Sequence, residues 1–120
     1  MRALRTLLAS CALAALAVAH AQDIYPNKPI RIIVPFTPGS ATDIVARLVG
    51  EKLNTAWGQP VIVENRPGAG GTIGIAQTAK ADPDGYTLAV VSTGHVVNYV
   101  LYKDLPYDTL KDLAGVAPLA

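Results

Sequence analysis

Hydrophobic and polar residues along the chain form two kinds of pattern. Short β-branched runs are the first kind, and the run from Ile30 to Val34 is interrupted only by Arg31. A nearly continuous apolar run of this length is typical of a strand that is buried on both faces of a parallel sheet. The second kind has apolar residues at spacings of three and four between Asp43 and Trp57, which predicts an amphipathic helix that ends at Gly58. Its apolar positions are Ile44, Val45, Leu48, Val49, Leu53 and Trp57.

The same alternation continues toward the C-terminus. The pattern predicts a second strand over Val61 to Val63, a turn over Glu64 to Gly71, and a helix over Thr72 to Ala81. It then predicts a third strand over Tyr86 to Val91, followed by a loop with room for a helical turn over Ser92 to Tyr102. Strands that alternate with helices predict an α/β domain, with a mostly parallel sheet, right-handed crossovers and flanking helices.

The first two predicted strands each end in a turn rich in proline, glycine and small polar residues. These turns read PFTPGSA and ENRPGAGG, and a helix is predicted after each. The first N–H groups of a helix have no partner within the helix and carry a positive partial charge, so they are suited to an anion. Two such turns in adjacent units predict a pocket for a carboxylate or a phosphate.

Each residue that stands out in these turns also has a plainer interpretation. Ser40 and Asp43 have the S-x-x-D spacing of a helix cap, and capping alone would explain them. Asp43 is poorly suited to contact an anion, so we expect it to orient the loop. Arg66 is either a carboxylate clamp or, as is more common for arginine on a loop, a surface residue. The glycines of the second turn, Gly68, Gly70 and Gly71, could serve only positive φ angles.

Familiar catalytic and nucleotide-binding motifs are missing from the sequence. Ile73 stands where a dinucleotide fingerprint has its third glycine, and no Gly-Lys-Ser/Thr of a phosphate loop occurs. Ser92 follows a strand but lacks the first glycine of a nucleophile elbow. The pair Asp82 and Asp84 lies on a turn, and we expect His95 to be a loop histidine whose polar atoms are satisfied. The sequence therefore predicts no catalytic residue, no metal site and no cofactor.

The first 21 residues have the pattern of an export signal. Met1 to Arg5 is a positive region, and Leu7 to Val18 is an apolar stretch shorter than the ~20 residues that a membrane span needs. Ala19-His20-Ala21 then fits the small-x-small pattern, so the mature chain is expected to begin at Gln22 in the periplasm. Lipid modification at Cys11 is the alternative, but most of the apolar stretch would then lie after the cleavage site.

Removing this segment changes the charge and the cysteine count. Without Arg2 and Arg5, eight basic residues face nine acidic ones, which gives no electrostatic footprint for nucleic acid or an anionic membrane. The single cysteine, Cys11, is removed as well, so disulfides, thiol nucleophiles and cysteine-based zinc sites are excluded. Residues 22–120 are enough for one small domain, but the last residues resemble the opening of another strand. We therefore expect the N-terminal part of a longer protein.

Four segments, in this order and spacing, are together distinctive. They are YPNKPIRIIVPFTPGSATDIVAR, GQPVIVENRPGAGGTIG, ADPDGYTL and HVVNYVLYKDLPYDTLKDL. They resemble the Bug-type (TctC-like) solute receptors of tripartite tricarboxylate transporters, and the likeness covers nearly all of the mature chain. It departs from the family pattern at Ser40 and Ala41, where consecutive glycines are common, and at Tyr99, where proline is usual.

This resemblance implies a periplasmic binding protein of the type II architecture, with two α/β domains and a ligand in the cleft between them. Residues 22–120 would be part of the first domain, and the second domain would be absent. The implied ligand is a small carboxylate, held largely by backbone N–H groups, and the implied partners are the transporter's membrane subunits, with the receptor a monomer. The corresponding positions are Pro38, Gly39, Ser40, Ala41, Thr42 and Asp43 in the first loop, Gly68, Ala69, Gly70, Gly71 and Thr72 in the second, and Ser92 and Thr93 in the third.

Two other functional classes stay open at the level of sequence. One is an α/β enzyme whose catalytic residues lie in the absent half, and the other is a periplasmic sensor that signals through a membrane protein. An acid, base or nucleophile projecting from the three loops would favour the enzyme. Loops dominated by backbone groups favour a receptor, which is the function that we expect.

The leader sequence leads to a first testable prediction. Cleavage is expected between Ala21 and Gln22, because the positive, apolar and small-residue regions then fall in the order that signal peptidase requires. N-terminal sequencing of the exported protein tests this directly. Recovery of the protein from the membrane fraction with a lipid on Cys11 would contradict it.

Overall fold

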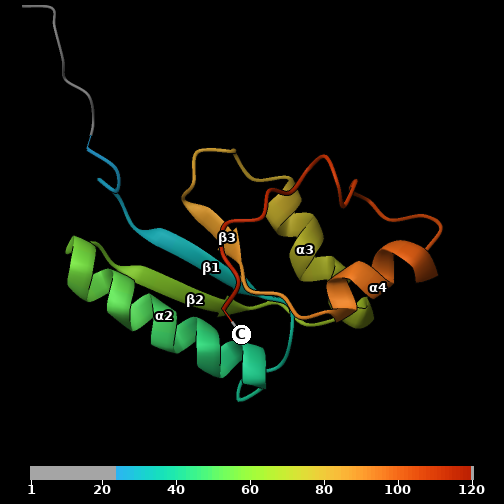
Figure 1. Ribbon diagram of the computed structural model, residues 1–120, viewed down its shortest axis with the longest axis horizontal. Helices are drawn as coiled ribbons and strands as arrows, with labels where there is room; N and C mark the ends of the chain where they lie inside the picture. Colours follow the sequence, from blue (N-terminus) through green and yellow to red (C-terminus); the bar gives the residue numbers. More distant parts are fainter. Residues whose placement is uncertain (1–23, 120) are drawn as a thin grey trace, which may run out of the picture.

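The computed structural model describes residues 24–119, which form a parallel sheet with helices on both of its faces (Figure 1). The sheet has three strands in the order β2-β1-β3, so that β1 is central. Both neighbours pair with β1 in parallel, with Ile32 opposite Val63 on one side and Leu88 on the other. The strands are β1 (Ile30–Val34), β2 (Val61–Asn65) and β3 (Thr87–Ala89).

Helices connect the strands and cover the sheet. The helix α2 (Ala41–Trp57) joins β1 to β2, and the short 3₁₀ turn η1 (Ala69–Gly71) leads into α3 (Thr72–Ala79) on the way to β3. The order of the strands makes the second connection run back across β1, so right-handed crossovers place α2 and α3 on opposite faces. Figure 1 shows this arrangement, with α4 (Gly94–Leu101) following β3.

The core lies around the central strand, as its apolar sequence predicts. Four of the five residues of β1 are at most 1% exposed, and only Arg31 is partly accessible. Ile32 and Val34 pack with Ala46 of α2, and the half-buried side chains around them come from β2, from β3 and the residue that follows it, and from the first turn. The prediction of a strand buried on both faces is therefore confirmed.

The helix α2 approaches the sheet through small residues rather than through its largest apolar ones. Ala46 and Gly50 are buried, and a Cβ atom added at Gly50 would lie 3.2 Å from Cγ1 of Val61. Ile44 and Leu48, which the periodicity placed on the apolar face, are 52% and 57% exposed. This part of the prediction is wrong, because small residues allow the close contact between helix and strand.

Several boundaries also differ from the sequence-based prediction. The second strand continues through Glu64 and Asn65, which had been placed in the turn, because Asn65 still pairs with Val34 of β1. The helix α2 begins two residues earlier, at Ala41, and α3 ends at Ala79.

The third strand is shorter than predicted. The segment after it, predicted as a loop with a helical turn, forms the eight-residue helix α4, although its β-branched valines disfavour a helix on their own.

The predicted export signal lies outside the described residues, and its cleavage stays a prediction. Within residues 24–119, no helix has both the length and the apolar character that are needed to cross a membrane.

Candidate functional site

Three turns meet at one edge of the sheet. Because β1, β2 and β3 are parallel, their carboxyl ends lie at the same edge, and each is followed by a helix. Figure 1 shows the N-terminal ends of α2, α3 and α4 gathered there. The three predicted loops, residues 38–43, 68–72 and 92–93, are these turns. The structure therefore brings all of the sequence-predicted site residues to one edge.

The first turn is held in place by its own side chains. Ser40 is the N-cap of α2, and its Oγ accepts a hydrogen bond from the amide of Asp43 at 3.3 Å. The carboxylate of Asp43 accepts a hydrogen bond from the amide of Gly39 at 2.8 Å. Ser40 therefore caps the helix as expected, and Asp43 orients the loop, although its acceptor bond goes to Gly39 rather than to the N-cap residue.

Asp43 is also the centre of a polar network. It is 3% exposed, and Arg47 contacts both of its carboxylate oxygens, with Nε 3.1 Å from Oδ2 and Nη2 3.0 Å from Oδ1. Nδ2 of Asn65 donates to Oδ1 of Asp43 at 2.9 Å and to the carbonyl of Phe36 at 3.1 Å. The Arg47 guanidinium, the Gly39 amide and Asn65 hold the pKa of Asp43 at about 2.

The second turn has a run of residues with positive φ. Gly68, Ala69, Gly70 and Gly71 have φ angles of 129°, 47°, 64° and 94°. Such a run is accessible to glycine and costly for other residues, which explains why three of the four are glycine. The glycines thus serve backbone geometry, as the plainer interpretation proposed. That geometry also determines where the amides of the turn point.

One residue that sequence reasoning missed connects this turn to α4. Asn98 is 7% exposed, and its Nδ2 donates to the carbonyl of Gly70 at 2.8 Å. A Cβ atom on Gly70 would lie 3.2 Å from the hydroxyl of Tyr102 and 3.5 Å from Oδ1 of Asn98. An asparagine among valines was the available signal, because a buried amide needs a hydrogen-bond partner.

The third turn is short, and its side chains face its own backbone. Oγ of Ser92 accepts a hydrogen bond from the amide of Gly94 at 3.3 Å, and Ser92 and Thr93 are both exposed. His95 does not match its prediction, because it lies in α4 and its buried Nδ1 has no partner among the described residues. Its ring stacks on Tyr107 with 6.3 Å between the centroids, and burial lowers its pKa. A residue from a segment far along the chain thus buries His95.

Several backbone amides at these turns have no partner within residues 24–119. The capping bonds engage Gly39, Ser40 and Asp43 in the first turn, and Gly71 and Thr72 in the second. The amides that no hydrogen bond engages include those of Ala41, Thr42, Ala69, Gly70 and Thr93. These N–H groups come from all three turns, and amides at the start of a helix are in general suited to an anion.

Arg66 lies next to the second turn and pairs with Glu64, near the end of β2. Its Nη2 lies 3.0 Å from Oε2 of Glu64, and Arg31 contacts the same carboxylate with Nε 2.8 Å from Oε1. The Arg66 side chain is half exposed. This pairing matches the interpretation of Arg66 as a surface residue and lowers the pKa of Glu64, chiefly through the Arg31 hydrogen bond.

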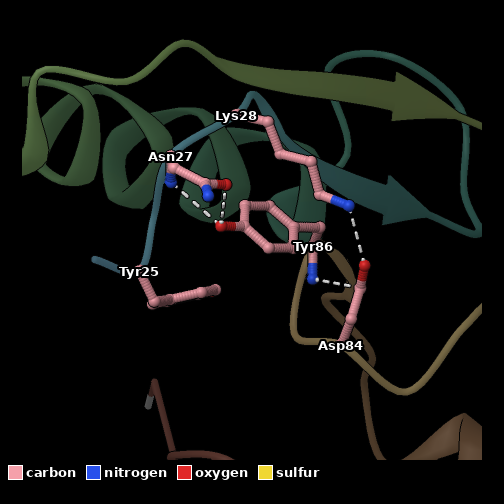
Figure 2. Close-up of a pocket in the computed structure, with 5 residues that line it drawn as sticks. All are labelled: Tyr25, Asn27, Lys28, Asp84 and Tyr86. Atoms are coloured by element: carbon pink, nitrogen blue, oxygen red, sulfur yellow. Dashed lines mark hydrogen bonds and ion pairs between the residues drawn. The ribbon is translucent and has the colours of Figure 1, made fainter. Parts of the chain in front are cut away.

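A hollow of about 480 Å³ lies near the start of β1, at the edge opposite the three turns. Figure 2 shows its lining, in which the side chains bond mainly to one another. Lys28 lies 2.9 Å from Asp84 and 4.3 Å from the ring centroid of Tyr86, whose hydroxyl donates to Asn27 at 2.8 Å. Tyr25 donates its hydroxyl to the carbonyl of Gly85. This cluster ties the lead-in of β1 to the turn before β3.

Comparison with known proteins assigns the chain to a family. A family described as the tripartite tricarboxylate transporter family receptor matches residues 45–120. The chain belongs to this receptor family. A UPF0065 protein of Bordetella bronchiseptica is 50% identical to the receptor chain over 117 residues, which are 96% of this chain and 35% of the relative. Protein BugT of Bordetella pertussis is 45% identical over 108 residues, covering 88% of this chain and 33% of BugT.

Solved structures agree with this assignment and confirm the type of fold. The periplasmic binding protein BugD matches the receptor chain with a TM-score of 0.69 and 42% identity, over 73% of this chain and 29% of BugD. MatC of Rhodopseudomonas palustris, solved with bound malate, matches with a TM-score of 0.66 and 39% identity, over 73% of this chain and 30% of MatC. A second R. palustris protein, solved with adipate, matches with a TM-score of 0.68 and 36% identity, over 72% of this chain and 29% of that protein.

These comparisons establish the general class of the receptor. The family consists of periplasmic solute-binding receptors rather than enzymes, and relatives in it have been solved with carboxylates. The chain spans about a third of the length of the relatives that it matches. Within the described residues, no group of three or more histidine, cysteine, aspartate or glutamate residues is placed to hold a metal ion.

The low pKa of Asp43 leads to a second testable prediction. Because the pKa is about 2 in the fold and 3.8 ordinarily, ionised Asp43 stabilises the fold above pH 4 and loses this effect as the pH falls toward 2. In the full-length receptor, Asp43→Asn should therefore lower the free energy of unfolding at pH 7. The difference from wild type should shrink between about pH 4 and pH 2.

Urea unfolding of both proteins across this pH range measures the effect. Asp82→Asn removes one exposed carboxylate and serves as the control for the change in net charge. A difference between wild type and Asp43→Asn that stays constant from pH 7 to pH 2.5 would contradict the role of the network.

Proposed function

We propose that this chain is the N-terminal part of a periplasmic receptor that captures a small carboxylate for a tripartite tricarboxylate transporter. The observation that carries the proposal is the set of unengaged amides at one edge of the sheet, contributed by Ala41, Thr42, Ala69, Gly70 and Thr93. Each lies at the start of a helix, where the backbone carries a positive partial charge. The site residues are those of the three turns, at positions 38–43, 68–72 and 92–93.

Fixed amide dipoles suit a family with different ligands. Backbone N–H groups can bind a carboxylate group whatever the remainder of the ligand is. Other parts of the site then recognise that remainder. The two R. palustris relatives, which were solved with malate and with adipate, support a carboxylate ligand for this receptor. Both of those ligands carry two carboxylate groups.

The rest of the proposal concerns the whole receptor. A second α/β domain would close over the three turns and complete the cleft. Export would follow cleavage after Ala21, and the loaded receptor, as a monomer, would deliver its ligand to the membrane subunits of the transporter. The low net charge after cleavage gives no attraction to nucleic acid or to anionic membrane surfaces.

The ligand class gives a third testable prediction. In the full-length receptor, a dicarboxylate such as malate or adipate, or an aromatic carboxylate, should raise the melting temperature. A hundredfold excess over the dissociation constant adds about 2.7 kcal/mol to the free energy of unfolding by linkage. The uncharged diamide of the same ligand is the control and should have no effect. A screen in which only sugars or cations stabilise the receptor would contradict the carboxylate assignment.

The means of holding the anion gives a fourth testable prediction. Gly70 has a φ of 64°, so Gly70→Val places a β-branched residue in a disfavoured region, at a cost of about 1–3 kcal/mol. It also crowds the hydroxyl of Tyr102. We expect strongly reduced ligand affinity for Gly70→Val. Arg66→Ala should retain most of the affinity, because Arg66 is paired with Glu64 and the turn amides are unchanged.

Calorimetric titration of both variants with the tightest-binding carboxylate distinguishes the two mechanisms, and circular dichroism checks that each variant is folded. A clamp by Arg66 predicts the reverse result, with a loss of ~2–5 kcal/mol for Arg66→Ala and tolerance at Gly70. That outcome would rule out binding by the turn amides.

A further inference from the structure

The buried carboxylate of Asp43 lies in an unexpected place for an anion site. Asp43 is 3% exposed and belongs to the first turn of α2, the same turn that presents the unengaged amides of Ala41 and Thr42. With a pKa of about 2, it is ionised at neutral pH. A fixed negative charge within one helical turn opposes the approach of a second anion, and the buried position of Asp43 limits screening by water.

Arg47 is the cation that faces this charge. It lies one turn further along α2, and its guanidinium contacts both carboxylate oxygens of Asp43, at 3.1 Å and 3.0 Å. The same guanidinium donates to Oδ1 of Asn65 at 3.0 Å. Since Asn65 also donates to Asp43, the three side chains hold one another in a single geometry. No other cation contacts Asp43 among residues 24–119.

The nearest other charged cluster does not help to neutralise the charge of Asp43. Arg31 and Arg66 are both paired with Glu64. Successive strand residues point to opposite faces, so Glu64 lies on the face away from its neighbour Asn65 and from α2. Neutralisation of Asp43 therefore depends on Arg47 alone within the described part of the chain.

We propose that Arg47 is a positioning residue of the carboxylate site, which cancels the charge of Asp43 and so sets the anion affinity of the first turn without touching the ligand. This inference rests on the proposed function, because it assumes that the turn amides bind a carboxylate. It has two consequences that a purely structural role does not share. The loss on removing the Arg47 charge is larger for a dianion than for a monoanion, and it shrinks as salt is added.

The experiment is calorimetric titration of the full-length receptor. The ligands are malate or adipate, whichever binds wild type more tightly, and the monoamide of that same dicarboxylate. Arg47→Gln should weaken binding of the dicarboxylate about tenfold at low salt, because the charge of Asp43 is then uncompensated, and weaken the monoamide less. The loss should diminish in 0.5 M salt, where the screening length is about 4 Å. Lys52→Gln removes the same charge from an exposed position on the same helix and should change affinity less than twofold.

A double substitution separates electrostatics from architecture. Asp43→Asn combined with Arg47→Gln removes both charges, so this double variant should bind the dicarboxylate more tightly than Arg47→Gln alone. Arg47→Lys keeps the positive charge without the two-point contact and should bind more tightly than Arg47→Gln. Arg47→Lys also replaces Arg47→Gln in the test if Arg47→Gln does not fold. It should be folded, which circular dichroism checks, and should retain binding.

Each result bears on one of the two proposals. Equal affinity of Arg47→Gln and wild type, or a double variant no better than Arg47→Gln, would overturn the role of Arg47 while leaving the carboxylate receptor in place. A loss that is equal for dicarboxylate and monoamide and insensitive to salt would overturn it as well. Wild-type receptor that binds neither malate, adipate nor any other carboxylate would overturn the proposed function itself.

Discussion

Parallel pairing of β1 with both of its neighbours is the constraint on which the rest of the structure depends. It places the carboxyl ends of three strands at one edge, so the three following helices all begin there. The buried side chains of β1, among them Ile32 and Val34, supply the apolar contacts that hold α2 on one face of the sheet. An antiparallel partner would have sent one of the turns to the opposite edge, and the unengaged amides would not be gathered together.

A second constraint is that the backbone at this edge must be rigid without using up its own N–H groups. In the first turn, Ser40 and Asp43 satisfy some amides and leave others unengaged. In the second turn, positive φ angles set the backbone, and Asn98 holds it by donating to the carbonyl of Gly70, which engages no amide of the turn. Side chains thus shape the site, while backbone groups are left to contact the ligand. Such preorganised dipoles need little rearrangement when an anion binds.

The use of a carboxylate for this purpose has an electrostatic consequence. Asp43 is a strong hydrogen-bond acceptor and holds the turn well, but it is negative in a place that favours anions. Arg47 and Asn65 compensate for it by hydrogen bonding and charge. The arrangement links the turn after β1, the end of β2 and the start of α2 in one network. This network explains why Asn65 lies in the strand although its sequence context suggested a turn.

The local features of this protein follow from the sequence because they depend on neighbouring residues. The α/β class, the buried first strand, the cap at Ser40 and the glycine-rich second turn all arise from short-range patterns, and the structure shows each of them. The bond from Asn65 to Asp43, the burial of His95 against Tyr107 and the bond from Asn98 to Gly70 join residues that are distant in sequence. Only the tertiary structure decides such contacts, because burial and hydrogen bonding depend on which elements pack together. For the same reason, the fold and not the composition determines which amides remain available to a ligand.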